Sequence, residues 1–261
     1  MILDKIIKSK KEEIEHHQRL RSLDDMRCRA KDAPPVVLMS ESLKAGPDNE
    51  IKIIAEIKRK SPSAGFLRLD LDITHVARMY DEAGASGLSV LTDGPFFQGS
   101  LEDLQRVRAV VTLPLLRKDF IFDPYQVYEA RVFGADCILL IARILEVRQL
   151  EDLMGLASEL EMEALVEIHS REEWEKISNI KIDLLGINNR NLDSLKINLQ
   201  TTVKLAQQIP QEALLVSESG IQSAADIRLL MKEAGVFRFL IGETLLRTQD
   251  PAKALKELLM G

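Results

Sequence analysis

Residues 51–65 read IKIIAEIKRKSPSAG, an apolar run that leads directly into a polar loop. Glu56 and Lys58 stand two residues apart near the end of the run, so on a β-strand their side chains project from the same face. The serines, proline and glycine that follow are typical of a loop. We interpret the stretch as a buried strand whose end carries paired charges, as expected of a strand that contributes to an active site.

The pattern of a short apolar run followed by a helical segment recurs from residue 51 onward. Several helical segments end in Gly, a common helix C-cap. Near-continuous apolar runs predict parallel strands buried on both faces, and a spacing of roughly 20–35 residues fits βα units. We therefore predict an α/β fold, a (β/α)8 TIM barrel; the alternative, an open doubly wound sheet, lacks a GxGxxG motif after its first strand. The eight runs are 51–58, 87–93, 113–120, 137–144, 163–169, 183–190, 213–220 and 237–244.

A charged helical segment precedes the first strand. Apolar residues recur at helical spacing from Ile2 to Ile14, which predicts an amphipathic helix over residues 2–31 with a charged outer face. The APP sequence at 33–35 ends it, and KAGPDNE at 44–50 is rich in turn residues. We expect one domain over residues 1–261, of which about 1–45 form an N-terminal helical extension.

Length and composition narrow the class of protein. A chain of 261 residues suits a single α/β barrel, and a net charge of −6 argues against a broad nucleic-acid surface. Cys28 and Cys137 form neither a disulfide framework nor a CxxC site. The N-terminus is too charged for a signal peptide, and no apolar run is long enough to span a membrane. We expect a cytoplasmic protein that binds neither membrane nor nucleic acid.

The ends of the predicted strands carry the candidate active site, because a (β/α)8 barrel places its site at the C-terminal ends of its strands. Two lysines and two carboxylates in one cavity can shift each other's pKa values and supply both an acid and a base. The alternative is a purely structural salt-bridge network, which adds little net stability. The four residues are Glu56, Lys58, Lys118 and Glu167.

Neighbouring charged residues receive simpler interpretations. Arg117 and Asp119 flank Lys118 and point to the other face of the strand, so we expect a salt bridge at the rim. His169 lies one step beyond Glu167 and is expected to support the site or to be solvated. His16 and His17 point about 100° apart on a helix and make a poor metal pair. We predict no metal site.

Two glycine-containing strand ends predict a phosphate site. SESG at 217–220 and LIGET at 240–244 follow the seventh and eighth strands. Loops there commonly bind phosphate through backbone N–H groups in this fold, and glycine lets the backbone approach the anion. Lys58 and Ser61 follow the first strand, which neighbours the eighth in a closed barrel, and could complete the site.

The motifs together resemble one family. KRKSPS and LRKDFIFDPYQ are specific to it, and ALVEIH, LLGINNRNL, VSESGI and FLIGETLLR follow in order. Over almost the whole chain the sequence is similar to indole-3-glycerol phosphate synthase. That resemblance implies decarboxylation and dehydration of 1-(2-carboxyphenylamino)-1-deoxyribulose 5-phosphate to indole-3-glycerol phosphate, without metal or organic cofactor. It also implies that the N-terminal extension covers the mouth of the barrel on the substrate side.

The resemblance also implies residue roles. Lys118 matches the general acid, and Glu167 a carboxylate assigned to proton transfer or to stabilising cationic intermediates. Lys58 matches a residue near the substrate carboxylate and the dehydration step. The other matches are Glu56 and Asn188 for substrate hydroxyls and amine, Glu218 and Arg190 for inner polar positions, Phe96 and Phe120 as walls for the anthranilate ring, and Ser61, Ser219, Gly220, Gly242 and Glu243 for the phosphate.

Two departures from the family pattern are Gln98 and Arg143, the latter placed to reach the site or its rim. Three other functions stay open at this point. The first is phosphoribosylanthranilate isomerase, although its Cys would have to lie at the carboxyl end of a strand and Cys137 begins one. The others are a Schiff-base aldolase using Lys118 or Lys58 and a non-catalytic barrel that binds a phosphorylated metabolite. We expect a small phosphorylated substrate and a monomer, with a dimer as the alternative.

Overall fold

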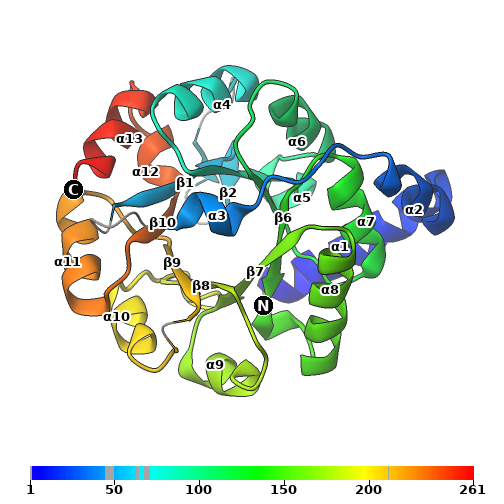
Figure 1. The fold of residues 1–261 in the computed structure, drawn as a ribbon. Coiled ribbons are helices and arrows are strands. Elements are labelled where there is room, and N and C mark those ends of the chain that lie inside the picture. Colours follow the sequence, from blue (N-terminus) through cyan, green and yellow to red (C-terminus); the bar gives the residue numbers. More distant parts are fainter. Residues whose placement is uncertain (1, 45–49, 63–64, 68–70, 211) are drawn as a thin grey trace.

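The computed structural model describes residues 2–44, 50–62, 65–67, 71–210 and 212–261. Eight parallel strands close into a barrel in the order β1-β10-β9-β8-β7-β6-β5-β4 (Figure 1). The closure confirms the predicted TIM barrel and excludes the open sheet. Each strand lies within one of the eight predicted runs: β1 Lys52–Ile57, β4 Gly87–Leu91, β5 Leu115–Lys118, β6 Cys137–Ile141, β7 Glu163–Ile168, β8 Leu184–Asn188, β9 Leu214–Glu218 and β10 Arg238–Ile241.

Helices surround the barrel and connect successive strands. Most begin at a side-chain cap; Asp123, for example, accepts a hydrogen bond from the backbone N–H of Tyr125 and forms a capping box with Gln126. The remaining elements are the short hairpin β2 Lys60–Ser61 and β3 Gly65–Phe66, the 3-10 turn η1 Ala142–Ile144, and the helices α4 Ile73–Glu82, α5 Gly94–Phe97, α6 Leu101–Arg108, α7 Pro124–Val132, α8 Val147–Glu159, α9 Arg171–Ile177, α10 Gln200–Ala206, α11 Ala224–Ala234, α12 Glu243–Leu246 and α13 Pro251–Leu259.

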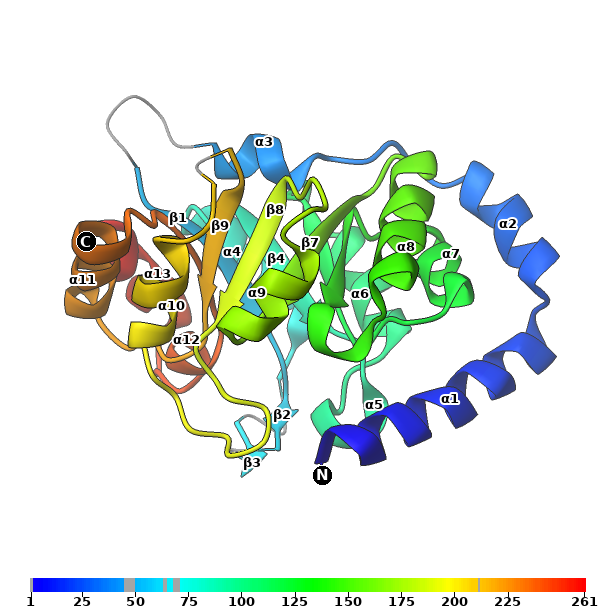
Figure 2. The ribbon, with the colours of Figure 1, turned by 90° about the horizontal axis from the view of Figure 1, so that it is seen from below.

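The N-terminal segment forms three helices, α1 Ile2–Leu20, α2 Leu23–Lys31 and α3 Met39–Leu43. The single helix predicted over residues 2–31 is therefore wrong. It breaks before Ser22, whose hydroxyl accepts a hydrogen bond from the backbone N–H of Asp25 and caps α2. Figure 2 shows α1 at the end of the barrel where β2 and α5 lie, and α3 at the opposite end. Because β2 follows β1 and α5 follows β4, the α1 end is the carboxyl end of the strands.

Helix α3 closes the amino-terminal end of the barrel. Met39 and Leu43 are fully buried and pack with side chains that point into the barrel, among them Ile54, Leu116 and Leu139. A larger apolar cluster fills the space between the outer faces of the strands and the surrounding helices. The barrel interior is thus filled at one end and leaves room for a cavity at the other. In the described residues, no helix combines the length and apolar character needed to cross a membrane.

Shortening Leu43 should destabilise the fold without damaging the carboxyl end of the barrel. Leu43→Ala leaves a cavity under the barrel floor, and a buried Leu→Ala change costs about 2–5 kcal/mol of unfolding free energy. Urea unfolding measures this loss. The matched control is Leu38→Ala, because Leu38 is 41% exposed and its truncation should change the unfolding free energy by less than about 0.5 kcal/mol. Equal effects of the two variants would contradict the role of α3 as a plug.

Candidate active site

A cavity of about 430 Å³ opens at the carboxyl ends of the strands. Helix α1 forms part of its wall through Ile2, Leu3 and Ile6. The structure brings nearly all the candidate residues together here, since Glu56, Lys58, Ser61, Lys118, Phe120, Glu167, Asn188, Arg190, Glu218, Ser219, Gly220, Gly242 and Glu243 all line the cavity.

Lys118 lies between two carboxylates. Its Nζ donates a hydrogen bond to Glu167 Oε2 at 2.9 Å and lies 3.3 Å from Glu218 Oε2. Both glutamates are buried, at ends of strands β7 and β9. Gly186 on β8 makes the position of Glu218 possible, because a Cβ atom there would lie only 2.2 Å from Glu218 Oε1.

The charges of this cluster set each other's protonation. Burial alone would lower the pKa of Lys118, but Glu167, Glu218 and Glu56 outweigh it and raise that pKa. Burial would raise the pKa of Glu167, but Lys118 and His169 outweigh it and lower that pKa. The pKa of Glu218 rises to about 8, because burial and the charge of Glu167 exceed the effect of Lys118. The cluster therefore combines a lysine of raised pKa, a carboxylate of lowered pKa and a second carboxyl group of raised pKa, the kind of donor and acceptor set that acid–base chemistry uses.

His169 supports Glu167 from behind the cavity. Its Nε2 lies 3.2 Å from Glu167 Oε1 and its Nδ1 lies 3.2 Å from Glu173 Oε2. Burial would lower the pKa of His169, but these two carboxylates outweigh it and raise that pKa to about 9. The residue is buried rather than solvated, so of the two expectations the supporting position is the one observed.

Glu56 and Lys58 project together, as their spacing predicts, and form an ion pair at the end of β1. Gly242, on the neighbouring β10 side, makes room for this pair, because a Cβ atom there would lie 2.5 Å from Glu56 Oε1. Asn188 also lines the cavity, and its Oδ1 accepts a hydrogen bond from the backbone N–H of Arg190.

The predicted phosphate residues lie on one side of the cavity. β10 pairs with both β9 and β1, so Gly242, Ser219 and Ser61 come from adjacent strand ends. Ser219 and Gly220 have φ values of 65° and 83°, a left-handed turn that L side chains rarely adopt. The Glu243 carboxylate pairs with Arg190 at 3.5 Å and with Arg247 at 3.0 Å. The group of Glu243 assigned to the phosphate is its backbone N–H.

An aromatic pair lines the cavity beside β4 and β5. Phe97 and Phe120 have ring centroids 6.3 Å apart and planes tilted by 39°. The assignment of Phe96 to this wall is not matched by the structure, because Phe97, and not Phe96, is among the lining residues. The difference arises in helix α5, whose short turn begins at the Asp93 cap and decides which of the two rings faces the cavity.

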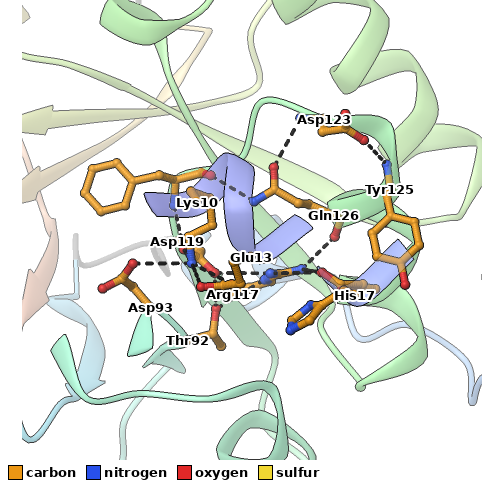
Figure 3. A network of polar contacts seen from close by, with 12 residues as sticks. Lys10, Glu13, His17, Thr92, Asp93, Arg117, Asp119, Asp123, Tyr125 and Gln126 are labelled. Carbon is orange, nitrogen blue, oxygen red and sulfur yellow. Dashed lines mark hydrogen bonds and ion pairs between the residues drawn. The ribbon is translucent and has the colours of Figure 1, made fainter. Parts of the chain in front are cut away.

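The opposite face of β5 carries a second charged network, shown in Figure 3. Arg117 is fully buried and lies 3.1 Å from Asp119 Oδ2 and 3.4 Å from Glu129 Oε2 on α7. The predicted Arg117–Asp119 salt bridge is therefore present, but it lies in the interior and not at the rim. Lys10 of α1 joins it, 3.0 Å from Asp119 Oδ1. Lys10 and Arg117 outweigh the effect of burial and lower the pKa of Asp119 to about 2.

The family resemblance assigned the N-terminal extension to the mouth of the barrel, but the contribution of Lys10 on α1 was missed. The buried residues of this helix are Leu3, Ile6, Lys10 and Ile14, spaced three and four apart. The signal was therefore present as a lysine on the apolar stripe of an amphipathic helix. His17, further along α1, lies 2.7 Å from Glu129 Oε1. Arg143 pairs with Asp193 at 2.6 Å, which places it at the rim. The described residues contain no cluster of potential metal ligands.

Comparisons with known proteins agree on one family. A family model described as indole-3-glycerol phosphate synthase matches residues 3–258. The chain is 47% identical over 264 residues to indole-3-glycerol phosphate synthase of Polaromonas naphthalenivorans strain CJ2, covering 98% of each chain. It is 45% identical over 261 residues to the protein of that name from Polaromonas sp. strain JS666, covering 98% of this chain and 97% of that one. The fold resembles 3-hexulose-6-phosphate synthase from Salmonella typhimurium, with a TM-score of 0.63 at 12% identity over 80% of this chain and 97% of that one.

His169 should make the stability depend on pH above neutrality. Its pKa is raised from 6.5 to about 9, so the folded protein keeps a proton that the unfolded chain releases between these values. The stabilisation is complete below pH about 6.5 and is lost as the pH rises through about 9. Urea unfolding of the parent protein and of His169→Gln, between pH about 6 and about 10, should show the two free energies converging as pH rises. Curves that stay parallel over that range would contradict a protonated His169.

Proposed function

The chain belongs to the indole-3-glycerol phosphate synthase family, and on that premise we propose that Lys118 is its general acid. The enzyme is a carboxy-lyase of tryptophan biosynthesis. It closes the indole ring of indole-3-glycerol phosphate from 1-(2-carboxyphenylamino)-1-deoxyribulose 5-phosphate, with loss of CO2 and water. The observation that carries the proposal is the ammonium of Lys118 in the cavity, hydrogen-bonded to Glu167 and close to Glu218.

The barrel order gives the substrate an orientation. We assign the phosphate to the ends of β9 and β10, at Ser219, Gly220 and Gly242, with the backbone N–H of Glu243 and with Lys58 and Ser61 from the adjacent β1 end. We assign the anthranilate ring to the aromatic pair beside β4 and β5. In the closed barrel β1 alone stands between β10 and β4, so we assign the ribulose chain to the part of the cavity between these two sites. The reacting carbonyl would then lie near Lys118.

The chemistry needs a proton at two oxygens. Attack of the aromatic ring on the substrate carbonyl leaves negative charge on the carbonyl oxygen, and Lys118 is placed to donate its proton there. CO2 then leaves from the ring carbon that has formed the new bond. Loss of water requires a proton on the departing hydroxyl, which we assign to Lys58 or Lys118, and removal of a proton from the neighbouring carbon bonded to nitrogen, which we assign to the Glu167 carboxylate. The Glu167 carboxylate stabilises the positive charge that develops at the substrate nitrogen.

Two residues hold the middle of the substrate in this proposal. Glu56 and Asn188 accept and donate hydrogen bonds to its hydroxyls and amine, while Glu218 and Arg190 complete the polar wall. Helix α1 covers the mouth on the side of the ring, because Ile2, Leu3 and Ile6 line the cavity. Exclusion of water by this cover strengthens the electrostatic effects inside.

The oligomeric state and location are also proposals. We propose that the enzyme acts as a monomer in the cytoplasm, with a dimer as the alternative. The support for the location is that the family belongs to a biosynthetic pathway. The net charge of −6 supports a small-molecule substrate rather than nucleic acid.

Removing the Lys118 ammonium should abolish most of the activity. Lys118→Ala is expected to lower kcat by about 10²–10⁴-fold or more, because general acid catalysis contributes an effect of that size. The assay is the fluorescence of indole-3-glycerol phosphate formed from the substrate, with EDTA present. The control is Lys181→Ala, since the Lys181 side chain is 91% exposed. If Lys118→Ala turned over as fast as the parent protein, the family would stand and the assigned acid would be wrong.

A further inference from the structure

Lys10 joins helix α1 to the ends of two paired barrel strands. Its ammonium lies 3.3 Å from Asp93 Oδ2 and 3.0 Å from Asp119 Oδ1, and 2.8 Å from Glu13 Oε1 on its own helix. Asp93 follows β4 and Asp119 follows β5. The side chains of Lys10 and both aspartates, which Figure 3 shows close together, are at most 1% exposed, so all three charges are buried.

Each aspartate also holds the backbone of one aromatic segment. Asp93 Oδ1 accepts a hydrogen bond from the backbone N–H of Phe96 at 2.8 Å and so caps α5, the helix that carries Phe97. Asp119 Oδ1 accepts a hydrogen bond from the backbone N–H of Phe120 at 2.8 Å. The two aspartates bridged by Lys10 are therefore the residues that orient the Phe97–Phe120 wall.

We propose that Lys10 is a positioning residue for this aromatic wall: its charge holds Asp93 and Asp119 in place, and they fix Phe97 and Phe120 against the ring of the substrate. The inference rests on the proposed function, which assigns the anthranilate ring to these two phenylalanines. It makes recognition of the ring depend on a side chain of the N-terminal helix that does not itself line the cavity.

The physical reason is the repulsion between buried carboxylates. Arg117 offsets the charge of Asp119 through Oδ2, but among the described residues Lys10 is the cation that contacts Asp93. Without it, two negative charges at neighbouring strand ends would lack a common counter-ion in a dry environment. One aspartate must then move or bind a proton. Movement of either one shifts the backbone that it caps, and with it a ring of the wall.

Other contacts dock α1 independently of the aspartates. Ile6 and Ile14 bury apolar area on the same face of the helix. Ile14→Ala therefore weakens the docking of α1 and leaves both aspartates with their cation. It is the matched control that separates a general loss of docking from the specific loss of the Lys10 charge.

The experiment compares Lys10→Met with Ile14→Ala in the full chain. Lys10→Met should raise the KM of the substrate by about tenfold or more, because breaking a buried ion pair leaves uncompensated charge. The inhibition constant of inorganic phosphate, which lacks the ring, should change by less than about twofold. Ile14→Ala should lower the unfolding free energy and leave KM within about twofold. An equal rise of KM in both variants would overturn the proposal.

A second substitution tests the charge itself. Asp93→Asn keeps an oxygen that can cap α5 and removes the negative charge, so Lys10→Met/Asp93→Asn should recover most of the lost KM. Failure of this rescue overturns the proposal. If Lys10→Met does not fold, the double variant decides alone: a folded protein with a KM near that of the parent supports the charge bridge, and an unfolded or high-KM protein overturns it.

Phe97→Ala distinguishes failure of this inference from failure of the proposed wall. A raised KM in Phe97→Ala together with an unaffected KM in Lys10→Met leaves the wall in place and rejects the role of Lys10. An unchanged KM in Phe97→Ala rejects the wall, and the inference fails with it.

Discussion

The site depends on one constraint: strand β5 and the residue after it carry charged side chains on both faces, and both faces are buried. Side chains alternate along a strand, so Lys118 points into the cavity while Arg117 contacts α7 and Asp119, which borders the cavity, contacts α1. All three are charged and largely buried, and an unpaired buried charge is costly. Each must therefore find a partner on its own side. Glu167 and Glu218 serve Lys118, and Lys10 with Glu129 serves the other face.

This constraint connects the chemistry to the N-terminal helix. Asp119 is the residue after Lys118 and accepts hydrogen bonds from Thr92 and the backbone of Phe120. The network on the helix side therefore fixes the backbone on which the lysine stands. On the cavity side, the two glutamates keep that lysine protonated, while His169 neutralises Glu167 from behind. The result is a preorganised group of charges whose positions do not have to change much when substrate binds.

Much of this architecture could be predicted from sequence because burial on both faces of a parallel strand leaves a simple apolar signature. The eight runs follow from that rule, and the charged and glycine-containing strand ends follow from the location of the site at the carboxyl ends of barrel strands. Arg117 and Asp119 were predicted on the correct face of β5 for the same reason. Their burial was not, because the sequence does not show that α1 and α7 cover them.

Features that depend on how separate elements dock were harder to predict. Lys10 stands among apolar residues on one helical stripe, but its two aspartate partners are more than 80 residues away in the chain. The choice of Phe97 over Phe96 depends on a single helical turn set by the Asp93 cap. The plug formed by Met39 and Leu43 lies at the amino-terminal end of the barrel, whereas α1 lies at the carboxyl end. Sequence periodicity does not show that the N-terminal segment runs from one end to the other.

The most direct test of the central claim is a crystal structure of the enzyme with a substrate analogue whose carbonyl is reduced to a hydroxyl and cannot react. The account predicts that Lys118 Nζ lies within hydrogen-bond distance of that hydroxyl, with the phosphate at Ser219, Gly220 and Gly242 and the ring against Phe97 and Phe120. A complex in which Lys118 stays on its two glutamates beyond reach of the hydroxyl, or in which the phosphate occupies the β4–β5 side, would contradict it.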